Sequence, residues 1–220
     1  TVAVMGPSGS GKSTLLHALA GIIRPTSGTV TFQGANLTAM SDADRTKLRR
    51  GAFGFVFQSG QLLPELPAVE NIALPMMLDG ADYRSATDAA MLWLERLGLR
   101  QLASQRPGEM SGGQMQRIAI ARALATDARA FLFDDSFSAL DYKTDAALRH
   151  ELSSRLGGKT VVIVAQRIST VLNADQIVVL DDGRVVGAGT HERLMESCRE
   201  YREIAMSQLS EEELKGGDAR

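Results

Sequence analysis

Short apolar runs alternate along the chain with segments whose apolar residues recur at helical spacing. The first run, residues 1–5, leads into a glycine-rich stretch and then into LLHALAGII, which has helical periodicity. Further apolar runs are predicted to be strands, at residues 29–34, 52–58, 128–133 and 160–166. The polar stretch NLTAMSDADRTKLRR separates the first two of these. This alternation predicts an α/β fold with a largely parallel sheet covered by helices.

The middle of the chain reads as helical throughout. Three segments there have helical spacing and are separated by Pro and Gly, at residues 68–78, 85–98 and 111–125. We therefore expect a single domain, with a core formed by residues 1–61 and 126–209 and a helical subdomain at about 62–125.

Beyond residue 130 the alternation returns. A helix is predicted at residues 143–156, and QIVVLDDGRVVGAG predicts a hairpin with Asp182-Gly183 at its turn. The polar end, residues 210–220, is predicted to fray.

Composition narrows the class of protein. The 220 residues are 44% hydrophobic and 23% charged, with a net charge of −2, which does not favour a nucleic-acid partner. No apolar run approaches the roughly 18 residues of a membrane-spanning helix, so a membrane role would have to come through a partner. The single cysteine, Cys198, excludes an internal disulfide and favours a reducing, cytoplasmic setting.

The glycine-rich stretch GPSGSGKST fits the pattern G-x-x-x-x-G-K-[ST]. A predicted strand precedes it and a predicted helix follows, which is the context that this phosphate-binding loop requires and that a chance glycine turn would lack. Its glycines let backbone N–H groups close around phosphates, Lys12 reaches the β- and γ-phosphates, and Ser13 can bind Mg²⁺. The candidate phosphate-binding residues are Gly6, Pro7, Ser8, Gly9, Ser10, Gly11, Lys12, Ser13 and Thr14.

Two carboxylates, Asp134 and Asp135, end the apolar run FLF. An Asp after a strand often forms only a turn. Because a phosphate loop is present, and ligands of open α/β sheets bind at the carboxyl ends of the strands, we expect Asp134 to bind Mg²⁺.

A second glycine pair precedes the helix predicted from residue 111. Ser111, Gly112, Gly113 and Gln114 would form another phosphate-binding cup at a helix start. Since one nucleotide does not need two cups, we expect a dimer in which this cup closes on the ATP of the opposite subunit. An ordinary glycine-rich helix start is the alternative.

Together, GPSGSGKST, Gln58, MSGGQMQR, FLFDD and SALD resemble, in order and spacing, an ABC-transporter nucleotide-binding domain. The resemblance covers nearly the whole chain and implies a RecA-like P-loop NTPase core with a helical ABC subdomain. It implies an ATPase that binds ATP and Mg²⁺ and pairs with a second ABC domain, as a homodimer or heterodimer. Transmembrane permease domains would hold it at the cytoplasmic face of the membrane.

The resemblance also assigns roles to individual residues. Gln58 would contact Mg²⁺ and the attacking water, and would mark the surface that faces the membrane subunits. Asp141, in the SALD segment, would belong to the loop that crosses between subunits. The aromatic residue that the family places against adenine is expected upstream of the phosphate loop, where this N-terminus reads as trimmed.

Two residues depart from the family pattern. Asp135 stands where the family usually has a Glu that orients or activates the water, and it is one methylene shorter. Gln166 stands where the family commonly has a switch His, and its amide can donate a hydrogen bond but cannot carry a charge. The histidines His17, His150 and His191 lie elsewhere and read as ordinary helix or loop residues.

The resemblance thus implies a catalytic set of Asp135, Gln58 and Gln166, and the departures at Asp135 and Gln166 predict that this set hydrolyses ATP slowly. One alternative is an ATP-binding dimerisation or regulatory module with negligible hydrolysis. Another is a soluble ABC ATPase with no role in transport, although the chain has neither a coiled-coil insert nor a basic stripe.

The two halves of the chain resemble different relatives. The front half is similar to the ATPase subunits of lipoprotein-releasing and macrolide-efflux transporters, which have separate permeases. From about residue 130 the chain resembles the degenerate subunit of heterodimeric multidrug exporters. This split predicts either a chimera with a seam near residues 115–130 or natural divergence.

Overall fold

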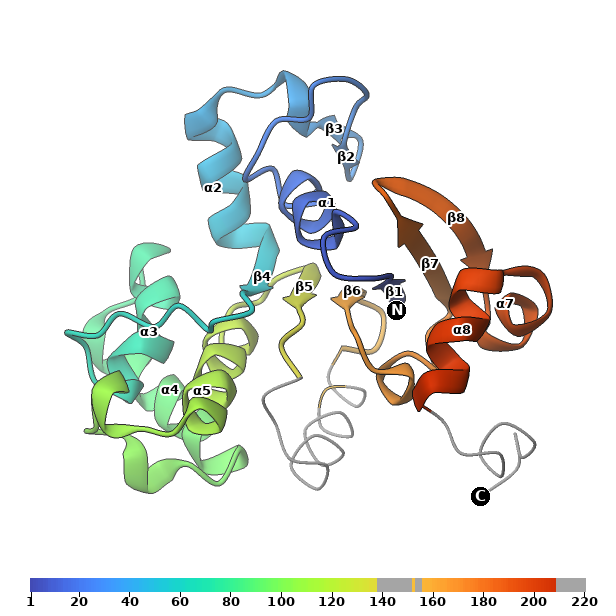
Figure 1. The fold of residues 1–220 in the computed structure, drawn as a ribbon. Coiled ribbons are helices and arrows are strands. Elements are labelled where there is room, and N and C mark those ends of the chain that lie inside the picture. The colour runs from blue at the N-terminus through green and yellow to red at the C-terminus, as the bar shows by residue number, and fades with distance from the viewer. Residues whose placement is uncertain (138–151, 153–155, 209–220) are drawn as a thin grey trace.

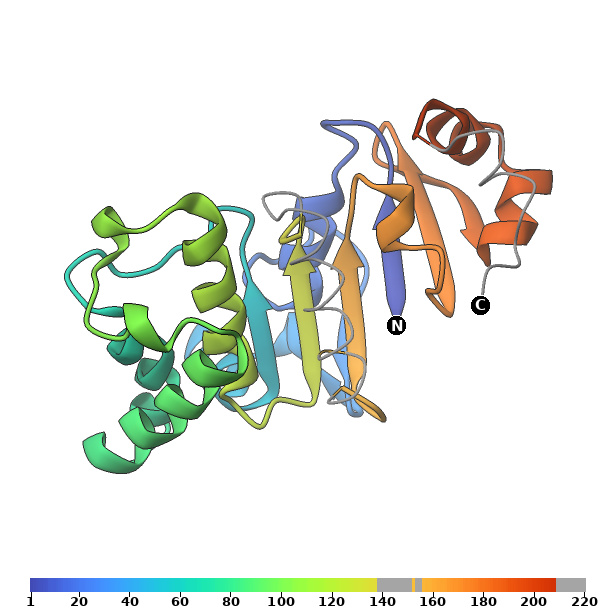
Figure 2. The ribbon, with the colours of Figure 1, turned by 90° about the horizontal axis from the view of Figure 1, so that it is seen from below.

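A six-stranded sheet forms the centre of the protein in a computed structural model that describes residues 1–137, 152 and 156–208. Its spatial order is β4 (Phe53–Val56), β5 (Ala130–Asp134), β6 (Thr160–Val164), β1 (Val2–Met5), β7 (Gln176–Asp181) and β8 (Arg184–Gly189). Neighbouring strands are parallel except at β7–β8, and Figure 2 shows them side by side. The predicted α/β fold with a mainly parallel sheet is confirmed.

Helices cover both faces of this sheet, as Figure 1 shows. On one face, Val4 and Leu132 pack with Leu16 of α1 (Lys12–Leu19). On the other, Phe133 packs with Ile120 of α5 (Gly112–Leu124). Because side chains alternate along a strand, these apolar runs serve both faces and read as continuous.

The helical part of the middle contains α3 (Ala68–Leu78), α4 (Tyr83–Arg96) and α5, with short 3₁₀ turns at η2 (Arg100–Leu102) and η3 (Pro107–Glu109). These three helices gather beside β4, at one end of the sheet (Figure 2). Ile72, Leu94 and Ile118 meet in their shared core. The helix predicted at residues 68–78 is confirmed as α3.

Between β1 and β4 the prediction needs correction. The strand predicted at residues 29–34 is a two-residue strand, β2 (Thr31–Phe32), paired with β3 (Ala35–Asn36). The polar stretch that follows folds into η1 (Leu37–Ala39) and the helix α2 (Asp42–Ala52). The strand predicted at residues 52–58 is confined to β4, since α2 runs to Ala52.

The C-terminal part begins with η4 (Ile168–Thr170) and the hairpin β7–β8. Its turn uses Asp182 and Gly183, with φ of 42° and 72°, as the Asp-Gly pair predicts. Two helices follow, α7 (His191–Ser197) and α8 (Arg199–Gln208), and Tyr201 is fully buried against the sheet. Most of the helix predicted at residues 143–156 and the predicted frayed end, 210–220, lie outside the described residues.

In the described ranges, no helix is both long and apolar enough to span a bilayer. The carboxyl ends of β1, β4, β5 and β6 open on one edge of the sheet, and register places Asp134 beside Val164 and Val164 beside Val4. Loops that follow these strands therefore meet at one edge.

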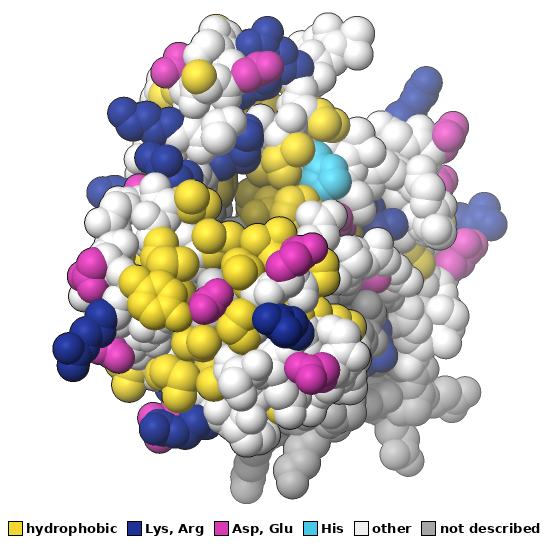
Figure 3. Space-filling model, turned by 90° about the vertical axis from the view of Figure 1, so that its left-hand side faces the viewer, with side chains coloured by type: hydrophobic (Ala, Val, Ile, Leu, Met, Phe, Trp, Pro, Cys, Tyr) yellow, Lys and Arg dark blue, Asp and Glu magenta, His cyan; other side chains and the backbone are white. Residues whose placement is uncertain are grey.

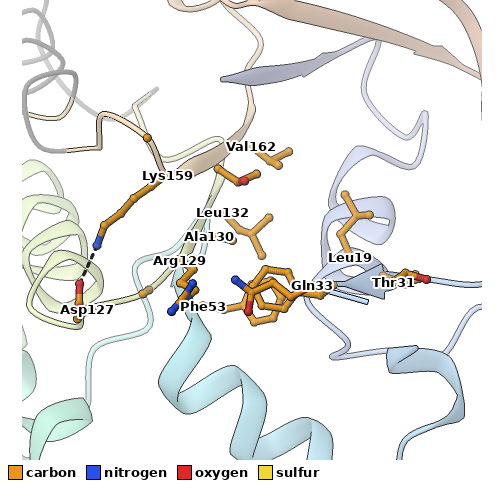
Figure 4. Close-up of a pocket in the computed structure, with 15 residues that line it drawn as sticks. Leu19, Thr31, Gln33, Phe53, Asp127, Arg129, Ala130, Leu132, Lys159 and Val162 are labelled. Carbon is orange, nitrogen blue, oxygen red and sulfur yellow. Dashed lines mark hydrogen bonds and ion pairs between the residues drawn. The ribbon is translucent and has the colours of Figure 1, made fainter. Parts of the chain in front are cut away.

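A cavity of about 650 Å³ lies at the opposite edge, where β5 and β6 begin (Figure 4). Leu132, Val162 and Phe53 form apolar walls, and the ion pair between Lys159 and Asp127 closes one side at 2.9 Å. The cavity is thus separate from the edge that carries the predicted site.

Candidate functional site

A glycine-rich loop joins β1 to α1. Gly6 has φ of 145°, and a Cβ there would lie 2.0 Å from the carbonyl oxygen of Leu180, so a larger residue would displace the loop. Gly11, with φ of 94°, caps α1 in the left-handed conformation. Such a loop before a helix N-terminus turns backbone N–H groups toward a bound anion. The residues predicted to hold phosphate, 6–14, therefore form one continuous structural unit.

Lys12 folds back over this loop. Its ammonium donates hydrogen bonds to the carbonyl oxygens of Gly6 at 3.0 Å and Pro7 at 2.7 Å, and lies 3.4 Å from Ser10 Oγ. Burial lowers the pKa of Lys12 from its ordinary value, whereas Asp135 and Asp134 act in the opposite direction. The loop thus holds a charged donor that can exchange carbonyl partners for phosphate oxygens.

Ser13 and Asp134 meet across the start of α1 and the end of β5. The Ser13 hydroxyl donates to Asp134 Oδ1 at 2.8 Å, and Asp134 is 3% exposed. Hydroxyl and carboxylate oxygens suit Mg²⁺. Among the described residues there is no cluster of three or more His, Cys, Asp or Glu that could hold a metal, so a cation here would take its remaining ligands from phosphate or water.

Two of the predicted catalytic residues, Gln58 and Gln166, direct their amides to one carboxylate oxygen of the third, Asp135. The Gln166 amide donates to Asp135 Oδ2 at 2.7 Å, and the Gln58 amide lies 3.5 Å from the same atom. They meet because β4, β5 and β6 are neighbours and these residues follow their carboxyl ends. Asp135 adopts a left-handed φ of 46°, which Asp tolerates better than most residues. Gln58, predicted also as a metal contact, directs its amide to Asp135 and not to the Ser13–Asp134 pair.

Sequence reasoning missed His17 as a neighbour of this site. His17 lies 3.9 Å from Asp134 Oδ2 through Nε2, and its ring packs against Phe55 and Phe57. Its position four residues after Ser13, on the same face of α1, was the available signal. Ser136, next to Asp135 in sequence, is fully buried and donates to the carbonyl oxygen of Val56 at 3.1 Å, joining the end of β5 to β4.

The second glycine pair starts α5. Ser111 Oγ accepts from the Gln114 N–H at 3.3 Å, and Gln114 Oε1 accepts from the Ser111 N–H at 2.8 Å. This capping box fixes the helix start while Ser111 and Gly112 remain exposed. The cup therefore faces outward, as binding to a second subunit would require. Asp141, the remaining predicted nucleotide contact, lies outside the described residues.

Comparison with known proteins gives consistent matches. The family model described as ABC transporter matches residues 1–138. A lipoprotein-releasing system ATP-binding protein, LolD, of Hyphomonas neptunium is 38% identical over 84% of this chain and 82% of its own. A macrolide export ATP-binding/permease protein, MacB, of Rhodopseudomonas palustris is 44% identical over 84% of this chain but only 28% of its own.

Among solved structures, a dimeric ATP-binding cassette in a post-hydrolysis state, bound to ADP and Pi, superposes with a TM-score of 0.82. It is 37% identical, covering 86% of this chain and 84% of that one. The LolD and MacB alignments each span 187 residues, so they extend past the predicted seam at residues 115–130. The chimera stays a prediction.

Proposed function

The chain belongs to the ABC transporter family as an ATP-binding, ATP-hydrolysing domain, and on this premise we propose that it dimerises around two ATP·Mg²⁺ to drive a separate membrane permease. The permease would hold it at the cytoplasmic face of the membrane. The second subunit would supply its Ser111–Gln114 cup to the ATP held by Lys12. One observation carries the proposal: the phosphate loop, the Ser13–Asp134 pair and Asp135 lie together at one edge of the sheet.

The residues present fit ATP and Mg²⁺. The glycine loop leaves space where a Cβ at Gly9 or Gly11 would meet nothing within 4 Å, and Lys12 supplies the charge. Ser13 Oγ and Asp134 would hold Mg²⁺, which when bound would offset negative charge on the β- and γ-phosphates. Ser13 would then turn its lone pairs to the cation, while Asp134 keeps its place at the end of β5.

Hydrolysis is proposed to be slow. Asp135 would orient the attacking water, yet its Oδ2 is engaged by the amide of Gln166. A carboxylate set back by about 1 Å from the reacting atoms can cost on the order of a hundredfold in rate. Gln166 can donate to a γ-phosphate oxygen, but without the charge that an imidazolium would bring.

A module with negligible hydrolysis is the second candidate, and the Gln166–Asp135 hydrogen bond favours it. In that case ATP would only hold the dimer together. A single-turnover assay separates the two, because slow hydrolysis converts bound ATP to ADP and a module without hydrolysis leaves it intact.

A groove between α2 and α3 supports docking of a permease. It encloses about 560 Å³ and is floored by Phe55 of β4 and by Phe57, which follows that strand, with Leu74 and Leu78 of α3 on one wall. Figure 3 shows hydrophobic side chains gathered across this face, with Lys and Arg side chains above them. The arginines bordering the groove are Arg49, Arg50 and Arg122.

Such a groove suits an amphipathic helix with acidic residues on its polar side. We propose that the occupant is a coupling helix of a permease of the lipoprotein-releasing or macrolide-efflux type, because the relatives with those names align over most of this chain. The surface concerned runs from Gln58 to Leu74.

Light scattering tests the proposed dimer directly. With ATP and Mg²⁺ the molar mass should double, and with ADP it should stay that of one chain. A monomer under both conditions, despite measured ATP binding, would contradict the proposal.

A further inference from the structure

Arg122 connects three parts of the molecule that the proposed function uses separately. It lies in the last turn of α5, the helix that starts at the Ser111 cup. Its guanidinium donates to the carbonyl oxygen of Gly60 at 2.7 Å and to that of Gln61 at 2.9 Å. Both residues belong to the loop that follows Gln58.

The backbone of this loop packs against α5. Gly60 and Gln61 both have left-handed φ, of 71° and 45°, and the Gly60 N–H donates to the Phe57 carbonyl at 2.9 Å. A Cβ on Gly60 would stand 3.4 Å from Ala119 Cβ, so the loop backbone rests on the helix. A non-glycine residue in the left-handed region is held there by its surroundings, and here the two charged hydrogen bonds of Arg122 do so.

The same side chain borders the groove between α2 and α3, together with Gln61 and Phe57. Arg122 is half-buried at this border, and burial lowers the pKa of its guanidinium from the ordinary value. Gln58, two residues before Gly60, directs its amide toward Asp135. The groove, α5 and the loop that follows Gln58 are therefore linked through the contacts of one side chain.

We propose that Arg122 is a positioning residue that couples occupancy of the groove to the placement of Gln58 at the nucleotide site. The proposal rests on the function above and adds its transmitting contact. Because coupling between two sites is reciprocal, ATP binding should also alter the groove, even with no permease present.

The test places a reporter in the groove. Leu78 is 58% exposed there, whereas the single native cysteine, Cys198, is 2% exposed, so Leu78→Cys can be labelled selectively with bimane. Bimane emission is followed as ATP·Mg²⁺ or ADP is added, and ATP binding is measured in parallel by titration.

Arg122→Met keeps the aliphatic stem and removes the donors, while Arg122→Lys keeps one charged donor without the fork. Arg202→Met is the matched control, because Arg202 also donates to two consecutive carbonyls, those of Met195 and Glu196, but far from the groove. Thermal unfolding of each variant reports the purely structural cost.

With Arg122 present, ATP·Mg²⁺ should shift the bimane emission and ADP should not. The ATP response should fall about fivefold or more in Arg122→Met, recover in part in Arg122→Lys and persist in Arg202→Met. Two results overturn the coupling alone: an undiminished change in bimane emission in Arg122→Met, or ATP binding without any change in emission in the labelled protein that keeps Arg122. Absence of ATP binding in the labelled protein that keeps Arg122 overturns the proposed function and the coupling with it.

Discussion

The side-chain amide of Gln166 donates a hydrogen bond to Oδ2 of Asp135, with 2.7 Å between nitrogen and oxygen. The residue at the switch position and the residue expected to orient water are therefore hydrogen-bonded to each other. The two departures from the family pattern thus act as one unit.

Lys12→Ala should weaken ATP binding strongly. The Lys12 ammonium folds over the phosphate loop, and a hydrogen bond from a charged group contributes about 1.5–3 kcal/mol, so affinity should fall by roughly 10- to 160-fold. Equilibrium titration with a fluorescent ATP analogue measures it. Lys159→Ala, at the opposite edge of the sheet, should bind normally. Unchanged affinity in Lys12→Ala would remove the basis of the nucleotide site.

Ser13→Ala should weaken the effect of Mg²⁺ and spare the phosphate contacts. Because Ser13 Oγ contacts Asp134 and not the loop carbonyls, ATP affinity in EDTA should be unaltered, while the gain on adding Mg²⁺ should fall about tenfold. Titrations with and without Mg²⁺ on the same variant provide the control. An equal loss in both would mean that Ser13 supports only the fold.

How much of this site the sequence predicts depends on chain distance. The sequence predicts that Asp134 lies at the carboxyl edge of a parallel sheet, and the structure has Asp134 as the last residue of β5. The family resemblance places Gln58, Asp135 and Gln166 in one catalytic set, but the local sequence pattern alone does not, since Gln58 is 77 residues and Gln166 is 31 residues from Asp135. Only the strand order β4-β5-β6 brings them together.

The helix α2 is not predicted from the sequence pattern, for a different reason. Its eleven residues contain little apolar periodicity, and its buried member is Arg45, which pairs with Asp42. The available signal was the cap, Ser41, whose Oγ accepts from the Asp44 N–H. Leu48 and Ala52 are the apolar residues of α2 that pack against the core, and both are only partly buried, which is too weak an apolar stripe for a sequence pattern to detect.

Ser111→Ala should abolish ATP-dependent dimers without lowering the ATP affinity of the monomer. Loss of the cap costs about 1 kcal/mol of stability, and the Ser111 hydroxyl would be missing from the cup offered to the second subunit. Ser41→Ala, which removes a comparable cap from α2, is the control for stability. Light scattering distinguishes them, and dimers of normal mass in Ser111→Ala would exclude the cup from the interface.

Cross-linking tests the permease surface. A cysteine in place of Leu74, inside the groove, should capture a coupling helix of a separate permease when membranes containing such a permease are added. A cysteine in place of Met206, exposed on α8, should not. Capture of an exporter's intracellular loop at Leu74 would show that the front half has been misinterpreted.

The most direct test restores the two family residues together, as Asp135→Glu and Gln166→His, and measures steady-state ATP hydrolysis. Steady-state turnover should rise at least about tenfold, a barrier change of about 1.4 kcal/mol. Each single substitution should raise turnover by a smaller factor, because the side chains at positions 135 and 166 are proposed to act on the same water and γ-phosphate, so their effects are not additive. ATP affinity should stay nearly unaltered, since Lys12, Ser13 and the glycines supply the ground-state contacts. Brisk turnover by the unchanged protein, with the double variant no faster, would contradict slow hydrolysis at this site.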